Sequence, residues 1–200
     1  MAGFYIMKLT LAIDTSTART QFAVLSGNEL KWLEIEDGAT THGDVLAKFG
    51  ELASREEIDQ VIVGMGPGPF TGLRTGIIFA KSFAFARGLP FHGICSLDAI
   101  AFDINLPEFI IATDARRKEV YWARYEGGQR VEGPNVSTPN DLTSFAHLPI
   151  FGDGALKYNL TSDTEHLFPD LTSFPKLAES SKIDEPLYLR HPDAVPTAER

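Results

Sequence analysis

The stretch GMGPGPFTGLRTG, residues 64–76, is the most informative part of the chain. It overlaps residues 60–65, whose β-branched and apolar side chains predict a short buried strand. Apolar residues at helical spacing then predict a long helix over residues 71–87. A strand that leads into a helix through a glycine- and proline-rich loop indicates an α/β fold.

The loop itself has two interpretations. The free N–H groups at the start of a helix favour an anion, and Thr71 is placed to cap them. However, the loop lacks the Gly-Lys-Ser/Thr ending of a P-loop, and Pro69 breaks the pattern G-x-G-x-x-G. A rigid structural turn is therefore the alternative to a phosphate-binding loop.

Sequence patterns on both sides of this loop predict further strands and helices. Three strands precede the first helix with nothing helical between them, which indicates an antiparallel meander. Two more helices are expected, the second with Ser96 as its N-cap. The expected strands are 8–13, 21–25, 30–35 and 91–95, and the expected helices are 42–55 and 96–103.

A candidate domain boundary lies at residues 105–107 and divides the chain into domains 1–105 and 106–200. After it the order of strand, acidic turn and strand begins again, with strands expected at 109–112 and 120–125. The repetition indicates either a diverged internal duplication or the recurrence of a common pattern. A helix that begins with proline is expected at 139–148.

Composition and charge exclude several classes of protein. Of the 200 residues, 44% are hydrophobic and 22% are charged, which is typical of a globular protein rather than a disordered one. Lys and Arg number 18 against 27 Asp and Glu, a net charge of −9, so no strong attraction to nucleic acid or an anionic membrane is expected. The acidity favours solubility or a basic partner. No apolar stretch is long enough to span a bilayer.

Few residues suggest chemistry of their own. Asp14 and Asp114 each follow a strand, where a carboxylate can hold Mg²⁺ or orient a water, or simply form a turn. Asp153, between two glycines, has the same ambiguity. The histidines form no close pair of zinc ligands, and the single cysteine, Cys95, excludes an internal disulfide. The basic run 116–118 is either a solvated turn or a contact for phosphate or RNA.

Small residues recur at every fourth position along the predicted helix 71–87. Glycine in a helix costs up to about 1 kcal/mol relative to alanine, so such a row is expected where another backbone must come close. The row could pack on its own sheet or on a helix of a partner. Because the opposite face is apolar too, the helix is either deeply buried or presented to a partner. Its members are Gly72, Gly76, Ala80, Ala84 and Gly88.

Four segments resemble the bacterial TsaB (YeaZ) family and occur in that family's order. They are LAIDTST at 11–17, GPGPFTGLRTG at 66–76, DARRKEVY at 114–121 and PLYLR at 186–190. One departure is Pro69, where the family usually has serine, so a hydroxyl and a backbone N–H are lost. The resemblance implies an α/β protein of two actin-like (ribonuclease H-like) lobes, each a mixed β-sheet flanked by helices.

The resemblance also implies a function. TsaB-like proteins serve the formation of N6-threonylcarbamoyladenosine (t6A) at position 37 of tRNA as cytoplasmic, non-catalytic partners of TsaD, and TsaE joins the pair. TsaD binds the metal and the tRNA, so contact with tRNA is expected only through TsaD, and no membrane is involved. The family's contact with TsaD is a bundle of the first two helices from each partner. The implied interface residues are Val45, Phe49, Gly72, Leu73, Gly76, Ala80 and Ala84.

The nucleotide-binding signatures of the actin-like fold map to three turns of this chain and look degenerate. Weak or shared binding of ATP or ADP with Mg²⁺ at the partner interface is therefore the furthest expectation, with no catalytic residue and no resident metal. The implied positions are Asp14, Thr15, Ser16, Asp114, Arg116, Gly152, Asp153 and Gly154. Three alternatives stay open: a kinase or ATPase that uses Asp14 and Asp114, a peptidase, and a module that forms homodimers when alone.

Overall fold

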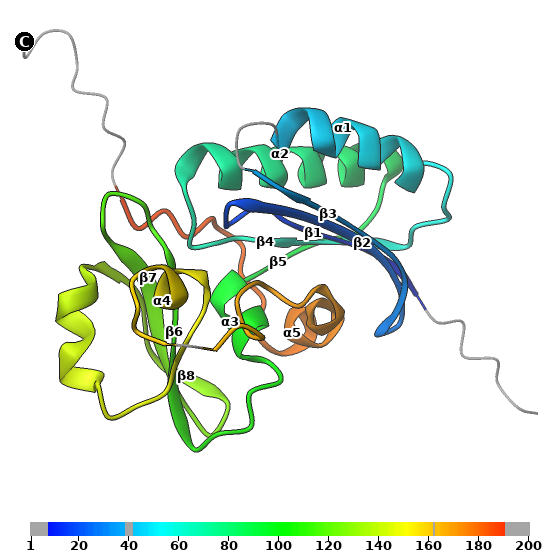
Figure 1. Cartoon of the computed structure of the whole chain (residues 1–200). Coiled ribbons are helices and arrows are strands. Elements are labelled where there is room, and N and C mark those ends of the chain that lie inside the picture. The colour runs from blue at the N-terminus through cyan, green and yellow to red at the C-terminus, as the bar shows by residue number, and fades with distance from the viewer. Residues whose placement is uncertain (1–7, 39–41, 162, 191–200) are drawn as a thin grey trace, which may run out of the picture.

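The computed structural model describes residues 8–38, 42–161 and 163–190, which form two mixed β-sheets (Figure 1). The first sheet has the strand order β3-β2-β1-β4-β5. Neighbours β1, β2 and β3 are antiparallel, which confirms the predicted meander, and β4 and β5 are added in parallel to β1. The strands are β1 (Leu9–Asp14), β2 (Arg19–Ser26), β3 (Glu29–Asp37), β4 (Gln60–Gly64) and β5 (Phe91–Ile94).

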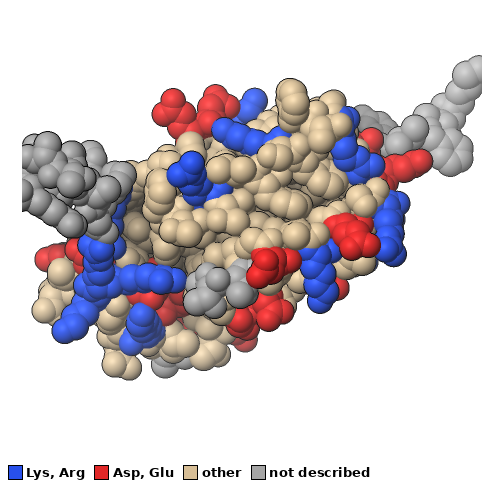
Figure 2. Space-filling view, turned by 90° about the horizontal axis from the view of Figure 1, so that it is seen from above, with Lys and Arg blue, Asp and Glu red and all other residues tan. Residues whose placement is uncertain are grey.

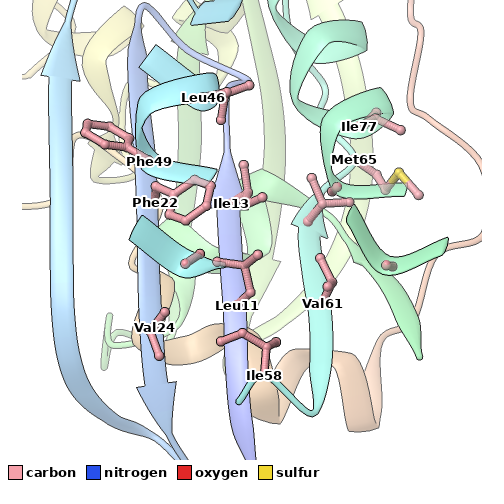
Figure 3. Close-up of a cluster of buried hydrophobic side chains, with 14 of the residues drawn as sticks. Leu11, Ile13, Phe22, Val24, Leu46, Phe49, Ile58, Val61, Met65 and Ile77 are labelled. Atoms are coloured by element: carbon pink, nitrogen blue, oxygen red, sulfur yellow. The ribbon is translucent and has the colours of Figure 1, made fainter. Parts of the chain in front are cut away.

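Two helices, α1 (His42–Ala53) and α2 (Phe70–Arg87), cover one face of this sheet (Figure 1). Alternate residues of the strands point toward them, because successive side chains of a strand face opposite sides. Figure 3 shows the resulting cluster, in which Leu11 and Phe22 from the sheet meet Leu46 and Phe49 from α1. Both helices were expected from apolar spacing, and both are confirmed.

Residues from the far end of the chain cover the other face of the first sheet. The helix α5 (Phe174–Ser180) follows a 3₁₀ turn, η3 (Leu171–Ser173), and Phe174 packs with Ala12 and Ile62 of the strands. The short helix α3 (Ser96–Ala101) lies on the same side. No helix or strand was predicted past residue 163, so this packing was not predicted. The division into domains 1–105 and 106–200 stays a prediction.

The second sheet has the strand order β8-β7-β6-β9, in which only the short β9 runs parallel to its neighbour β6. Its strands are β6 (Glu108–Asp114), β7 (Val120–Glu126), β8 (Gln129–Ser137) and β9 (Ile150–Phe151). The helix α4 (Asp153–Lys157) was not predicted. The predicted helix at 139–148 is a 3₁₀ helix, η2 (Pro139–Phe145), with proline at its start and a capping box between Thr138 and Asp141.

A strap formed by residues 183–190 runs between the two sheets (Figure 1). The N–H of Ile183 donates to the carbonyl of Gly93 in β5 at 2.8 Å, and the N–H of Leu187 donates to the carbonyl of Met65 at 2.8 Å. At its far end the guanidinium of Arg190 donates to the carbonyl of Ala115, beyond β6, at 2.9 Å. The strap thereby links the loop after β4 to the loop after β6.

Candidate functional site

Between the two sheets lies a cavity of about 360 Å³ at the start of α2. The turn after β1, the first turn of α2 and the loop that follows β6 contribute to its walls. The predicted cap is wrong: Thr71 is not the N-cap of α2, because the helix begins at Phe70 and Pro69 precedes it without any side-chain bond. The residues that line the cavity are Thr17, His42, Pro69, Phe70, Thr71, Gly72 and Arg116.

Asp14, at the end of β1, is buried and fully engaged within the chain. Its carboxylate accepts hydrogen bonds from the backbone N–H and hydroxyl of Ser16, at 2.8 and 2.6 Å, and from the hydroxyl of Ser96 at 2.7 Å. Burial raises the pKa of this carboxyl, while the bonds from Ser16 and Ser96 oppose the shift. Ser96 therefore donates a hydrogen bond to Asp14 and is not the N-cap of α3, which is Cys95.

The glycines of the loop at 64–76 permit close contact with the turn that holds Asp14. A Cβ at Gly64 would lie 1.9 Å from Asp14 Oδ2, and one at Gly68 would lie 2.4 Å from the carbonyl oxygen of Ser16. Neither position has room for a side chain. The structure thus supports the interpretation of this loop as a rigid structural turn packed on the turn after β1.

The row of small residues on α2 has the same explanation. A Cβ at Gly76 would lie 2.2 Å from Thr15 Oγ1, and the hydroxyl of Thr15 donates to the carbonyl of Gly72 at 2.8 Å. Ala80 and Ala84 are buried in the cluster between α2 and the sheet. The first four members of the row therefore pack on the sheet and the turn after β1, as the simpler interpretation predicted, whereas Gly88 is the exposed left-handed C-cap of α2.

This placement changes which side of the helices is expected to make direct contacts with a partner. Of the seven residues implied for the interface, Val45 is partly buried and the others are buried beneath α1 and α2. The buried ones are Phe49, Gly72, Leu73, Gly76, Ala80 and Ala84. The interface itself stays a prediction.

Asp114 and Asp153 meet at the end of β6. The carboxylate of Asp114 accepts from Lys157 Nζ at 2.6 Å and from the hydroxyl of Tyr158 at 3.2 Å, and its backbone N–H donates to Asp153 at 3.1 Å. Burial raises the pKa of Asp153 to about 6. Gly152 and Gly154 lie against the backbone of β6, where a Cβ would come within 2.3 and 2.5 Å of it.

The loop after β6 adds positive charge to the cavity. Arg116, Arg117 and Lys118 all have left-handed backbone conformations, with φ of 59°, 53° and 62°. Such conformations are costly for residues other than glycine, so three in a row mark a shape that the fold enforces. Burial and the nearby Arg116 lower the pKa of His42, whose Nδ1 lies 2.5 Å from the hydroxyl of Thr20.

The cavity could bind an anion. The first turn of α2, whose N–H groups have no side-chain cap, lines the cavity together with Arg116. Two of the predicted nucleotide positions, Asp14 and Asp153, are turned to internal hydrogen bonds instead. Among the described residues no group of His, Cys, Asp and Glu is arranged to hold a metal ion, and no helix could cross a membrane.

The outer face of α1 and α2 is a second candidate site. The sequence predicted an apolar face opposite the small-residue row, but the exposed residues of this face were not identified. Phe85 is 90% exposed and Ile78 is 50% exposed, one above the other on α2, and Leu52 of α1 is also exposed. Figure 2 shows this face as a broad area with little charge, surrounded by both basic and acidic side chains. The missed signal was two large apolar residues seven positions apart on the side of α2 that faces away from the sheet.

These features define an α/β protein with two mixed β-sheets flanked by helices. A family model described as "TsaD: tRNA N6-adenosine threonylcarbamoyltransferase" matches residues 46–173. An uncharacterized protein of Mycobacterium tuberculosis is 37% identical over 94% of this chain and 94% of its own length. The chain belongs to the TsaB/YeaZ family.

Other relatives match over different lengths. A Mycobacterium leprae protein is 38% identical over 95% of this chain, which spans 57% of that relative's length. The "tRNA threonylcarbamoyladenosine biosynthesis protein TsaB" of Haemophilus influenzae is 32% identical over 57% of this chain and 52% of its own length. The crystal structure "YeaZ from Pseudomonas aeruginosa" has a TM-score of 0.70 at 22% identity and covers 90% of this chain and all of that one, which shows the shared fold.

Proposed function

We propose that this chain is a non-catalytic subunit for the formation of t6A in tRNA, and that it binds a TsaD protein through the outer face of α1 and α2. The observation that carries the proposal is the exposed pair Ile78 and Phe85 on α2. Relatives named for threonylcarbamoyladenosine biosynthesis support the choice of pathway. TsaE joins the complex, tRNA is contacted only through TsaD, and the complex is cytoplasmic.

The exposed apolar side chains explain why a partner would bind here. Burying a side chain such as Phe or Ile contributes about 1.5–3 kcal/mol, and large apolar residues on a soluble protein commonly mark an interface. Basic residues flank the pair, since Arg74, Lys81 and Arg87 are exposed on the same helix. We therefore expect a partner surface with an apolar centre and acidic residues at its rim.

The engagement of Asp14 supports a non-catalytic role. A carboxylate that takes part in phosphoryl transfer must reach Mg²⁺ or water, whereas both oxygens of Asp14 accept bonds from Ser16 or Ser96. Asp14 is also 1% exposed. Turnover of ATP by the isolated chain that is lost in Asp14→Asn would instead favour the kinase or ATPase alternative.

The test is capture of purified TsaD by variants of the outer face. Phe85→Asp and Ile78→Asp should each weaken binding at least about tenfold, because each puts a charge in the centre of the contact. Leu106→Asp is a matched control, since Leu106 is an exposed apolar residue away from α1 and α2. Circular dichroism would show that all three variants fold. Undiminished binding of TsaD by Phe85→Asp and Ile78→Asp would refute the assignment of the interface to this face.

The same face provides for self-association when TsaD is missing. Light scattering of the isolated protein should then show a dimer that Phe85→Asp converts to a monomer. Added TsaD should replace one copy of the chain in the dimer, so that a heterodimer forms. A dimer that is unaffected by Phe85→Asp would place self-association on a different surface.

A second function, weak or shared binding of ATP or ADP with Mg²⁺, is favoured by the cavity at the start of α2. The free N–H groups of the helix and Arg116 would bind phosphate oxygens. Calorimetric titration with Mg²⁺ and ADP, alone and with TsaD, tests this. Binding that Arg116→Ala does not weaken would contradict the assignment of the cavity.

A further inference from the structure

The first sheet ends on one side in β3 (Glu29–Asp37), the outermost strand at the left of Figure 3. Within the described residues no strand pairs with its outer side. An edge strand presents a row of unpaired N–H and C=O groups, and it will pair with another strand unless something prevents it. This edge is a different surface from the helical face proposed for TsaD, because it is formed by a strand of the sheet.

The edge strand of the second sheet has features that hinder pairing with a further strand. Its outer strand β8 contains Pro134, and its pairing with β7 is interrupted at two places. In contrast, β3 contains no proline, and its one irregularity lies opposite Val24 and Leu25, close to the turn that joins it to β2. Residues 32–37 therefore form a regular edge, without the proline and the interruptions in pairing found in β8.

One side of this edge is apolar. Leu33 pairs with Ala23 and Ile35 pairs with Gln21, so both point to the face that α5 covers further in. They are 39% and 42% exposed, and beside them a cavity of about 190 Å³ is lined by Leu30, Phe168 and Pro169, among others. Apolar side chains of an added strand would fill this groove.

The other side of the edge begins with the half-buried Trp32 and is acidic beyond it. Glu34 pairs with Phe22 and Glu36 with Thr20, so both carboxylates point to the face that α1 covers. They form no ion pair within the described residues, whereas the cations of this edge are engaged. Arg19 pairs with Asp37 at 2.8 Å, and Lys31 pairs with Glu56 at 2.5 Å. The edge therefore carries uncompensated negative charge, in keeping with the net charge of −9.

We propose that an extended segment of a partner protein adds to β3 along residues 32–37, and that its residues alternate between apolar side chains and Lys or Arg. Successive residues of a strand face opposite sides, so the apolar ones would meet Leu33 and Ile35 while the basic ones would meet Glu34 and Glu36. A second copy of β3 does not fit, because its own glutamates would add like charges to the same edge.

The alternating pattern gives a direct test on the full chain. The probe is the fluorescein-labelled peptide Val-Lys-Val-Lys-Val-Lys, and its binding is followed by fluorescence anisotropy. Saturable binding is expected, with Leu33→Asp and Glu36→Lys each weakening it at least about tenfold. Val131→Asp is the matched control, because Val131 is an exposed apolar residue on the protected edge strand β8. Binding that is equal in all variants would overturn the proposal.

A second measurement separates strand addition from attraction of charges alone. The same peptide with every backbone nitrogen methylated keeps its lysines but cannot donate hydrogen bonds to β3. It should bind at least about tenfold more weakly, and nuclear magnetic resonance should show the amides of residues 32–37 shifted by the unmodified peptide. Equal binding of the methylated peptide, or shifts confined to other strands, would refute the proposal. If the free protein forms a dimer that Leu33→Asp disrupts, the edge binds a second copy of this chain, and the proposal of a different partner protein is overturned.

Discussion

Gly76→Ala tests whether the small-residue row of α2 packs on its own sheet. The added methyl group would lie 2.2 Å from Thr15 Oγ1 and 3.0 Å from Thr15 Cγ2, so the helix or the turn after β1 has to move. Neither can move freely, because Thr15 is buried and its hydroxyl is bonded to the carbonyl of Gly72. The substitution is therefore expected to destabilise the folded protein.

Two opposing terms set the size of the effect. Overpacking of a well-packed site costs typically about 1–3 kcal/mol, while alanine gains up to about 1 kcal/mol over glycine in a helix. An approach of 2.2 Å is far inside van der Waals contact, so the overpacking cost should lie at the upper end, about 2–3 kcal/mol. The net loss in the free energy of unfolding is then about 1–2 kcal/mol, which lowers Tm by roughly 2–8 °C in a chain of this size. Urea titration followed by circular dichroism measures it. Gly43→Ala is the matched control in α1, since nothing lies within 4 Å of its Cβ position.

A second substitution identifies the atom responsible. Thr15→Ala removes both the hydroxyl and the methyl group that the new side chain meets, at the cost of about 1 kcal/mol for the lost hydrogen bond. The double variant should therefore be more stable than the sum of the single effects by about 1 kcal/mol or more. A Gly76→Ala protein that is as stable as the wild type but no longer binds TsaD would refute this reasoning, since the row would then face a partner.

Three further predictions concern titration, reactivity and the strap. Burial raises the pKa of Asp153 from 3.8 to about 6, so the folded state binds the extra proton between these values, and the free energy of unfolding should fall as pH rises from 4 to 6. In urea titrations at several pH values, Asp153→Asn should remove this decrease in the free energy of unfolding, which is on the order of 1–3 kcal/mol between pH 4 and 6. Burial also raises the pKa of the Cys95 thiol to about 12, so a disulfide reagent at pH 8 should label it only after unfolding; rapid labelling of the folded protein would contradict its burial. Arg190→Ala removes the bond to Ala115 and the ion pair with Glu119, and hydrogen exchange at residues 114–119 should become faster; unchanged exchange would show that the strap does not hold this loop.

Local patterns predicted most elements of the first sheet. Strands at 8–13, 21–25 and 30–35 correspond to β1, β2 and β3, and the helices at 42–55 and 71–87 correspond to α1 and α2. These elements bury one face against a neighbour that is close in sequence, so their periodicity records their environment. The repeated order of strand, acidic turn and strand likewise has a counterpart in β1 to β2 and β6 to β7.

Long-range packing could not be predicted in the same way. The helix α5 covers strands more than a hundred positions earlier, and no local pattern shows that Phe174 will meet Ala12. The predicted cap at Ser96 was wrong for a similar reason, whereas the one at Thr71 was wrong because α2 begins one residue earlier, at Phe70. Ser96 donates to Asp14, a partner 82 residues away, and this contact replaces the local bond expected of a cap.

The two aspartates that ended equivalent strands in the sequence differ once the chain is folded, and the difference bears on function. Asp14 is enclosed by Ser16 and Ser96, whereas Asp114 is partly exposed and pairs with Lys157. A magnesium site built from both would need Asp14 to break its hydrogen bonds and Asp114 to release Lys157. A site left with one available carboxylate binds Mg²⁺ weakly unless a nucleotide supplies the remaining oxygens. This asymmetry supports the proposal that any nucleotide in the cavity is held by the N–H groups of α2 and by Arg116, and that chemistry belongs to the partner.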